Sequence, residues 1–195
     1  MRVTGIILAG GKSKRMGKDK IFLPFPDRPL LEVMVDKLSS LFPQLLIITH
    51  LPVNFQEKDK IKVAPDILPN KGPLGGIYTG LLYSRSEYNF IVACDLPFLQ
   101  ERLVRKIIEA SEGYDVILPE WGGKLQPLCA VYSRNCISPI EKELRQNNLK
   151  ITSFFSLVKV RVIEEEEVLK WDPEGISFLN INTPEDYRRA IRGRK

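Results

Sequence analysis

Hydrophobic and polar positions follow two alternating patterns along most of the chain. Short apolar runs rich in β-branched residues predict strands over residues 3–9, 45–49, 61–66, 89–95 and 114–120. Apolar residues at helical spacing predict helices over residues 29–42, 74–84 and 100–111. Because strands that alternate with helices form βαβ units, the predicted fold class is α/β, with a mostly parallel sheet and helices on both faces.

The second half of the chain has a less regular pattern. It predicts a strand over residues 125–133, a helix over 134–148 and a strand over 158–164. A last strand is predicted over residues 176–182, where Thr183 and Pro184 then suit the N-cap and first turn of a helix. No repeat or linker interrupts the pattern, so we expect residues 1–195 to form a single domain.

Composition narrows the class of protein. The chain has 195 residues, 44% of them hydrophobic, yet its apolar runs are too short to cross a bilayer and its N-terminus lacks the core of a signal peptide. We therefore expect a cytoplasmic protein without a membrane partner. Cys94, Cys129 and Cys136 lie in or beside apolar segments without C-x-x-C pairing, which predicts buried thiols rather than disulfides or a zinc site.

The single histidine and the net charge limit the chemistry. A catalytic triad would depend on His50, and no G-x-S-x-G motif is present, which disfavours a hydrolase. The net charge of +5 admits an anionic partner, either a nucleic acid or a polyphosphate, or simply a solvated basic surface. The basic clusters have no interleaved aromatic residues for base stacking, so we expect no nucleic-acid partner.

The segment "LAGGKSKRMGKDK" (8–20) follows the first predicted strand, at the sheet edge where open α/β folds bind ligands. It matches neither a P-loop, because Gly5 lies one residue too far from Gly11, nor the G-x-G-x-x-G fingerprint. Adjacent glycines at 10 and 11 favour a loop whose amides approach a triphosphate, with Arg15 and Lys20 balancing its charge. The alternative is a solvated basic loop.

The same segment closely resembles the L-A-G-G-x-S-x-R-M-G-x-D-K signature of molybdenum cofactor guanylyltransferases, nucleotidyltransferases with a Rossmann-like sheet. Further segments resemble motifs of this family in the same order: "PDILPNKGPLGG" (65–76), "ACDLPF" (93–98), "LQPLCAVY" (125–132) and "LNINTPEDY" (179–187). The resemblance covers nearly the whole chain. The Gly10-Gly11 pair separates the sequence from relatives with L-A-A-G, which include cytidylyltransferases.

The resemblance implies transfer of GMP from GTP to the phosphate of molybdenum cofactor (molybdopterin), with release of pyrophosphate. Such a transfer depends on charge neutralisation and in-line positioning, so it needs no histidine. The family also implies transient contact with molybdoenzymes or cofactor-delivery proteins. Two alternatives stay open at this point: a nucleotidyltransferase with another phosphorylated acceptor, and a non-catalytic nucleotide-binding module.

The resemblance also assigns roles to individual residues. Asp95 is expected to bind Mg²⁺, a choice that agrees with the preference of this ion for carboxylate oxygens; the alternative is an Asp that caps the following turn. Lys20 and Arg15 are expected to act on the phosphates. Main-chain groups of four residues are expected to line the nucleotide: Leu8, Ala9, Gly10 and Gly11.

The remaining expected contacts lie at three other strand ends. Asp66 is expected to contact the nucleotide and can accept hydrogen bonds from guanine; the alternative is a role in an Asx-turn. Asn180 and Asn182 are expected to face one side of the last strand, near the metal or the acceptor; the alternative is that they make buried hydrogen bonds at a strand end. Thr49 or His50 stands where the family often has an Asn, and that contact is left unassigned. Residues 120–160 show no readable motif for the acceptor.

Overall fold

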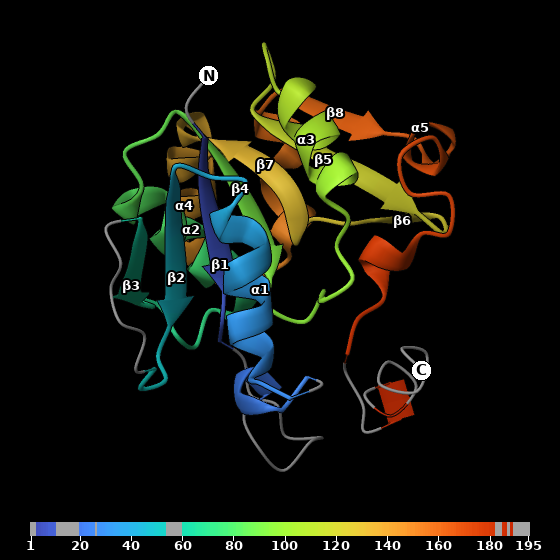
Figure 1. Cartoon of the computed structure of the whole chain (residues 1–195). Helices are drawn as coiled ribbons and strands as arrows, with labels where there is room; N and C mark the ends of the chain where they lie inside the picture. The colour runs from blue at the N-terminus through green and yellow to red at the C-terminus, as the bar shows by residue number, and fades with distance from the viewer. Residues whose placement is uncertain are drawn as a thin grey trace.

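The computed structural model describes residues 3–10, 20–25, 27–53 and 60–181, and residues 185, 186 and 188. These residues form a sheet in the order β3-β2-β1-β4-β7-β5-β6, in which β8 pairs with β5 (Figure 1). The strands are β1 (Val3–Leu8), β2 (Gln44–Thr49), β3 (Ile61–Pro65), β4 (Tyr88–Ala93), β5 (Val116–Trp121), β6 (Lys124–Leu125), β7 (Cys129–Ser133) and β8 (Val160–Ile163). The α-helices are α1 (Leu30–Ser39), α2 (Gly72–Tyr83), α3 (Glu101–Glu109), α4 (Ile137–Arg145) and α5 (Glu165–Leu169).

Four neighbouring strands, β3, β2, β1 and β4, run parallel to one another. Their carboxyl ends therefore meet at one edge of the sheet, the lower edge in Figure 1. On the other side of β4, strand β7 pairs antiparallel with both β4 and β5, and β8 runs parallel to β5. The prediction of an α/β fold with a mostly parallel sheet is confirmed.

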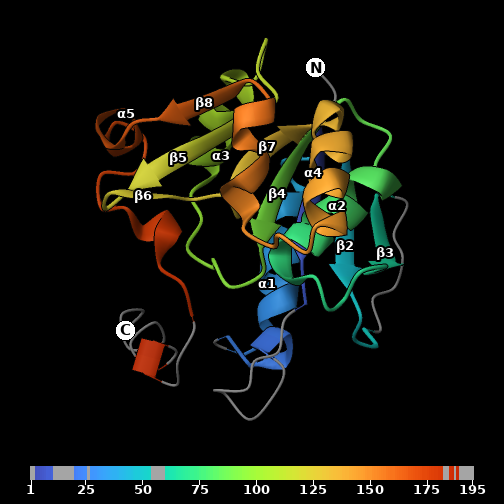
Figure 2. The same ribbon diagram turned by 180° about the vertical axis from the view of Figure 1, so that it is seen from behind.

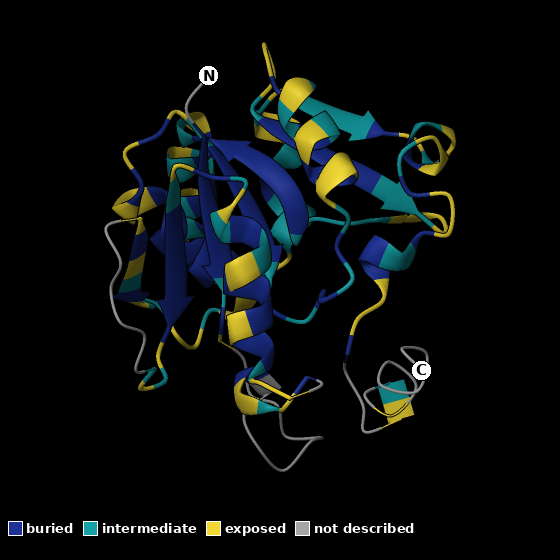
Figure 3. Ribbon diagram, viewed as in Figure 1, coloured by how far each residue is buried: buried dark blue, intermediate teal, exposed yellow. Residues whose placement is uncertain are grey.

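The sheet separates two hydrophobic cores. Successive side chains of a strand point to opposite faces, so Ile7 packs with α1 and α3 on one face while Ile6 packs with α2 and α4 on the other. Figures 1 and 2 show these helix pairs on the two sides of the sheet. In Figure 3 the central strands are almost wholly buried and the outward helix faces are exposed. The uninterrupted apolar runs of these strands follow from burial on both faces.

The structure corrects the prediction for residues 176–182. Instead of a strand, Ile176–Phe178 form a 3₁₀ helix, and residues 179–181 are not in a strand either. The physical reason is Asp172, whose carboxylate accepts hydrogen bonds from the main-chain N–H groups of Ile176 (3.2 Å) and Ser177 (2.8 Å). These bonds fix a tight turn where the apolar alternation alone favours an extended chain. The predicted helix start at Thr183 and Pro184 lies outside the described residues.

The prediction for residues 125–133 also changes, because two strands share the range. A turn separates β6 from β7, in which the Cys129 N–H donates to the Gln126 carbonyl at 3.0 Å. All three cysteines are buried and none of them forms a disulfide, as predicted. Burial raises the pKa of the Cys129 thiol to about 12.

No helix within the described part of the chain is long and apolar enough to span a membrane. The single-domain organisation and the cytoplasmic location stay predictions.

Candidate functional site

The candidate site lies along the edge where four parallel strands end. The strand order brings the residues after them into one row: Asp66 after β3, His50 after β2, Gly10 after β1 and Asp95 after β4. Neighbouring strands are about 4.8 Å apart, so three intervals place β3 and β4 roughly 14 Å apart. The row therefore joins residues that are as many as 85 positions apart in the sequence.

Main-chain hydrogen bonds extend the parallel pairing past the strand ends and fix this row. The Ala9 N–H donates to the Ile48 carbonyl at 2.8 Å, and the Cys94 N–H donates to the Leu8 carbonyl at 3.2 Å. On the other side, the Asp66 N–H donates to the Thr49 carbonyl at 3.2 Å. The main chain at all four strand ends is thus held in register up to the first residues of the loops.

Gly10 is exposed at the centre of the row. Among the residues that the structure describes, a Cβ built on it would meet the His50 ring, whose Nδ1 would lie 3.4 Å away, an ordinary contact. Its φ is outside the left-handed region, so its backbone conformation does not require glycine. As far as the described residues go, the missing side chain leaves space above the main chain, where a ligand can approach closely.

The end of β2 presents His50 rather than Thr49. The Thr49 side chain is buried, and its Oγ1 accepts a hydrogen bond from the Leu51 N–H at 3.0 Å. This hydroxyl therefore closes a local turn, while His50 is exposed beside Gly10. Of the two residues at the position that the sequence left unassigned, His50 is the exposed one and lies beside Gly10.

Asp95 follows β4 by two residues, after the buried Cys94, and its Oδ1 is shielded from solvent. The Asp95 carbonyl accepts a hydrogen bond from the Ile181 N–H at 3.1 Å. This bond brings residues 179–181 to the edge of the sheet, with Asn180 exposed beside the buried Ile181. Asn180 therefore reaches the site through a tertiary contact and not as part of a strand.

The Asp66 carboxylate is half-buried and held by two donors. Its Oδ1 accepts hydrogen bonds from the Leu68 N–H at 3.0 Å and from the Thr79 hydroxyl at 2.9 Å. The first bond is the Asx-turn considered from the sequence, which does not exclude contact with a ligand. Thr79 was missed by the sequence reasoning, although a buried polar residue in the apolar, glycine-rich sequence of α2 was a usable signal.

Some predicted site residues fall outside the described part of the chain. They are Gly11, Arg15 and Asn182, together with the side chain of Lys20, whose main chain begins the 3₁₀ helix Lys20–Phe22. Their roles stay predictions. Leu8 and Ala9 are described: Ala9 is buried, and Leu8 packs toward α2, where a Cβ on Gly76 would lie 3.3 Å from its Cδ2.

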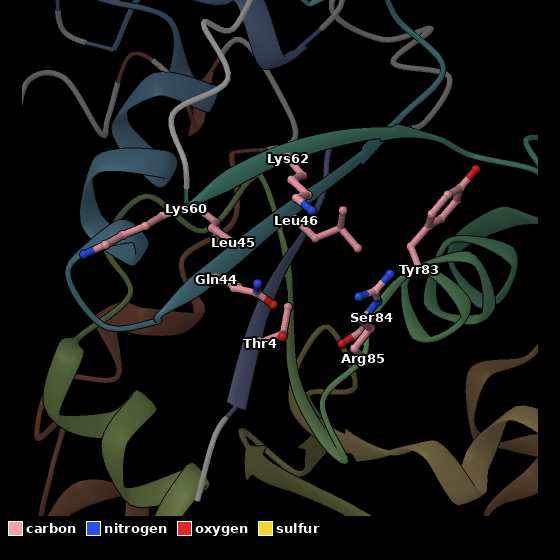
Figure 4. A pocket seen from close by; sticks show the side chains of 9 residues that line it. All are labelled: Thr4, Gln44, Leu45, Leu46, Lys60, Lys62, Tyr83, Ser84 and Arg85. Atoms are coloured by element: carbon pink, nitrogen blue, oxygen red, sulfur yellow. The ribbon is translucent and has the colours of Figure 1, made fainter.

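A hollow of about 90 Å³ lies at the opposite edge of the sheet, away from this row (Figure 4). It is bordered by residues near the starts of β1, β2 and β3 and by the end of α2, including Thr4, Gln44, Lys62 and Arg85. Figure 4 shows the Lys62 and Arg85 side chains on two sides of it. None of the predicted site residues lines this hollow, so it is separate from the candidate site.

Comparison with known proteins decides the family. The model of the MobA-like NTP transferase domain matches residues 5–160. A molybdenum cofactor guanylyltransferase of Desulfosudis oleivorans is 38% identical over 190 residues, which make up 96% of this chain and 94% of that protein. This chain belongs to the molybdenum cofactor guanylyltransferase family. The resemblance seen in the sequence motifs is confirmed, and membership of this family makes the chain a nucleotidyltransferase.

Solved structures support the same assignment at the level of the fold. The molybdopterin-guanine dinucleotide biosynthesis protein A of Archaeoglobus fulgidus superposes with a TM-score of 0.82 at 25% identity, covering 97% of each chain. A 2-C-methyl-D-erythritol 4-phosphate cytidylyltransferase of Francisella tularensis gives a TM-score of 0.70 at 12% identity, covering 97% of this chain and 98% of the other. The second likeness shows a shared fold alone.

The residues at this edge of the sheet could hold a metal ion if the substrate supplied some of its ligands. Among the residues that the structure describes, no cluster of three or more His, Cys, Asp or Glu side chains could hold a metal by itself. Asp95 offers one carboxylate, with a solvent-shielded oxygen, at the end of β4. Mg²⁺ usually takes one or two carboxylates and completes its shell with phosphate oxygens and water, so the residues of the candidate site fit Mg²⁺.

Proposed function

We propose that the chain transfers GMP from GTP to molybdenum cofactor in an Mg²⁺-dependent reaction. The observation that carries the proposal is the row of Asp66, Gly10 and Asp95 over roughly 14 Å of the sheet edge. An extended nucleotide fits such a row with its base at the β3 end and its phosphates at the β4 end. The name and near full-length similarity of the Desulfosudis relative support GTP and molybdenum cofactor as the two substrates.

At the base end, Asp66 would read guanine. A carboxylate accepts hydrogen bonds from N1–H and from the exocyclic amine of guanine, whereas adenine presents an acceptor at N1. With ATP, a buried acceptor would lose its partner, at a cost of roughly 1–3 kcal/mol for each unsatisfied group. The expected preference for GTP over ATP is therefore of order ten- to several hundred-fold.

At the phosphate end, the chain would position and neutralise charge. Main-chain groups of Leu8 to Gly11 would line the nucleotide, and the cations of Arg15 and Lys20 would balance its phosphates. Asp95 would hold Mg²⁺, which supplies positive charge to the phosphate oxygens when bound. A terminal phosphate oxygen of the acceptor attacks the α-phosphorus of GTP, and the bond to pyrophosphate breaks. Asn180 and Asn182 would face the acceptor side of this centre.

A second candidate keeps the transfer of a nucleotide but changes the acceptor to another phosphorylated compound. A non-catalytic nucleotide-binding module is the third, and it leaves Asp95 at the end of β4 without a role in chemistry. Contact with molybdoenzymes or cofactor-delivery proteins would follow from the proposed product. Transfer to molybdenum cofactor is the function that the similarity over 96% of the chain favours.

A transfer assay with each of the four nucleoside triphosphates, with and without molybdenum cofactor, tests the proposal. We expect GTP and the cofactor together to give a product heavier by GMP, detected by mass spectrometry. Asp95→Asn should lower kcat by at least about a hundredfold, because it weakens a ligand for Mg²⁺ at nearly constant volume. Asp36→Asn is the control, since Asp36 lies on the solvent-facing side of α1 and forms an exposed ion pair with Arg28. Equal use of GTP and CTP would overturn the guanylyl assignment.

A further inference from the structure

The Asp66 carboxylate divides its hydrogen bonds unequally between its two oxygens. Oδ1 accepts from the Leu68 N–H and from the Thr79 hydroxyl, at 3.0 and 2.9 Å. Within the described part of the chain these are the hydrogen bonds that the carboxylate makes, and both go to Oδ1. Two donors from different elements, a loop and a helix, thus fix the rotation of the carboxylate and leave Oδ2 for a ligand.

Thr79 reaches Asp66 because α2 packs directly against the sheet through its glycines. Gly76 and Gly80 face the strands, and a Cβ on Gly80 would lie 2.9 Å from Ile6 Cγ2. Thr79 itself is completely buried. Its hydroxyl is therefore removed from water, and Asp66 is the partner that the fold provides for it.

We propose that Thr79 is a positioning residue for base recognition, which acts by holding Asp66 in the orientation that reads guanine. The inference rests on the proposed function, because it assigns the guanine contact to Oδ2 of Asp66. Without the hydroxyl, the carboxylate keeps one donor and gains rotational freedom. It then loses part of the hydrogen-bond geometry that guanine needs and that adenine does not use.

The test compares Thr79→Val, which removes the hydroxyl at nearly constant shape, with Thr79→Ser, which keeps it. Thr4→Val is the matched control, because buried Thr4 shares a 2.8 Å hydrogen bond with Ser86 at the opposite edge of the sheet. We expect Thr79→Val to lower kcat/KM for GTP about tenfold, mainly through KM, with a smaller loss for ATP. Thr79→Ser and Thr4→Val should keep the wild-type GTP preference.

A double-mutant cycle shows whether Thr79 acts through Asp66. In an Asp66→Ala background, Thr79→Val should cause no further loss of the GTP preference. An equal loss in both backgrounds, or an unchanged preference in Thr79→Val alone, overturns the inference. If Thr79→Val does not fold, Thr79→Ala against Thr4→Ala gives the same comparison.

Calorimetric binding of GTP and ATP to the wild-type chain separates this inference from the proposed function. Wild-type binding without preference for GTP overturns both. A clear wild-type preference that Thr79→Val retains overturns the role of Thr79 alone and leaves guanylyl transfer standing. A preference that falls in Thr79→Val but not in Thr79→Ser or Thr4→Val supports the inference.

Discussion

Two glycines of this chain have different physical reasons to be glycine. Gly175 has φ of 61°, and a Cβ there would lie 1.8 Å from Cζ2 of Trp121, so both its conformation and its surroundings require it. Gly10 has neither constraint from the described residues, among which its Cβ would make an ordinary contact with the His50 ring. Because the described residues do not require a glycine at position 10, we infer that the residue is glycine to keep the space above it free for a ligand.

A Gly10→Ala substitution should therefore separate folding from binding. We expect the free energy of unfolding to change by less than about 0.5 kcal/mol, since none of the described residues opposes the methyl group. The affinity for GTP should fall at least about tenfold, because the methyl group occupies space that the nucleotide approaches. Chemical denaturation and calorimetric titration with GTP and Mg²⁺ measure the two effects. Unchanged GTP affinity would show that the nucleotide does not pass over Gly10.

At the scale of one element, α2 is built to lie close to the sheet. Its sheet-facing side carries Gly76 and Gly80 together with buried Leu74, Ile77 and Leu81. The low side-chain volume lets the helix axis approach β1, and this approach carries Thr79 to Asp66. The packing of α2 thus links the hydrophobic core on this face to the candidate site.

Two alanine substitutions in α2 should have opposite outcomes. A Cβ on Gly80 would lie 2.9 Å from Ile6 Cγ2, deep in the core, so overpacking of about 1–3 kcal/mol should exceed the gain of about 1 kcal/mol in helix propensity. Gly76→Ala is the matched control, since its Cβ would meet the flexible end of Leu8 at 3.3 Å. Denaturation should show Gly80→Ala less stable and Gly76→Ala unchanged or slightly more stable. Equal effects would contradict this account of α2.

Over the whole molecule, Asp115 joins elements of the second half of the sheet. Its carboxylate accepts hydrogen bonds from the Ser133 hydroxyl at the end of β7, from the Asn135 amide before α4 and from the Lys159 N–H before β8. Partial burial raises the pKa of Asp115. The hydrogen bonds from Lys159, Asn135 and Ser133 lower this pKa, and together their effect is larger than that of burial. The net result is a pKa below the ordinary value for Asp.

Acid should weaken the fold through this group. Because the unfolded state binds a proton more readily than the folded state, the contribution of Asp115 to stability is complete above its ordinary pKa. It is lost as the pH falls through its lowered value. Denaturation between pH 7 and pH about 3 should show a smaller acid-induced loss of stability in Asp115→Asn than in the wild type. An identical pH dependence in both proteins would remove Asp115 from this role.

The sequence by itself determined the class of fold and the motif that names the family. Apolar runs in β1, β2 and β4 report burial on both faces, which is a local property of each strand and can be read without the structure. The segment at residues 8–20 likewise carries its chemistry within one stretch of chain. The order of the motifs then sufficed to predict which strand ends hold Asp66 and Asp95.

Only the tertiary structure decided the contacts between distant segments. The 3₁₀ turn at Ile176–Phe178 depends on the Asp172 carboxylate, the placement of Asn180 depends on the bond from Ile181 to Asp95, and the orientation of Asp66 depends on Thr79. The local sequence pattern indicates whether a residue is buried. It does not indicate which distant residue forms a hydrogen bond with it. Those partners are chosen by the packing of α2 and of the C-terminal segment against the edge of the sheet, where hydrogen bonds outweigh the local preference.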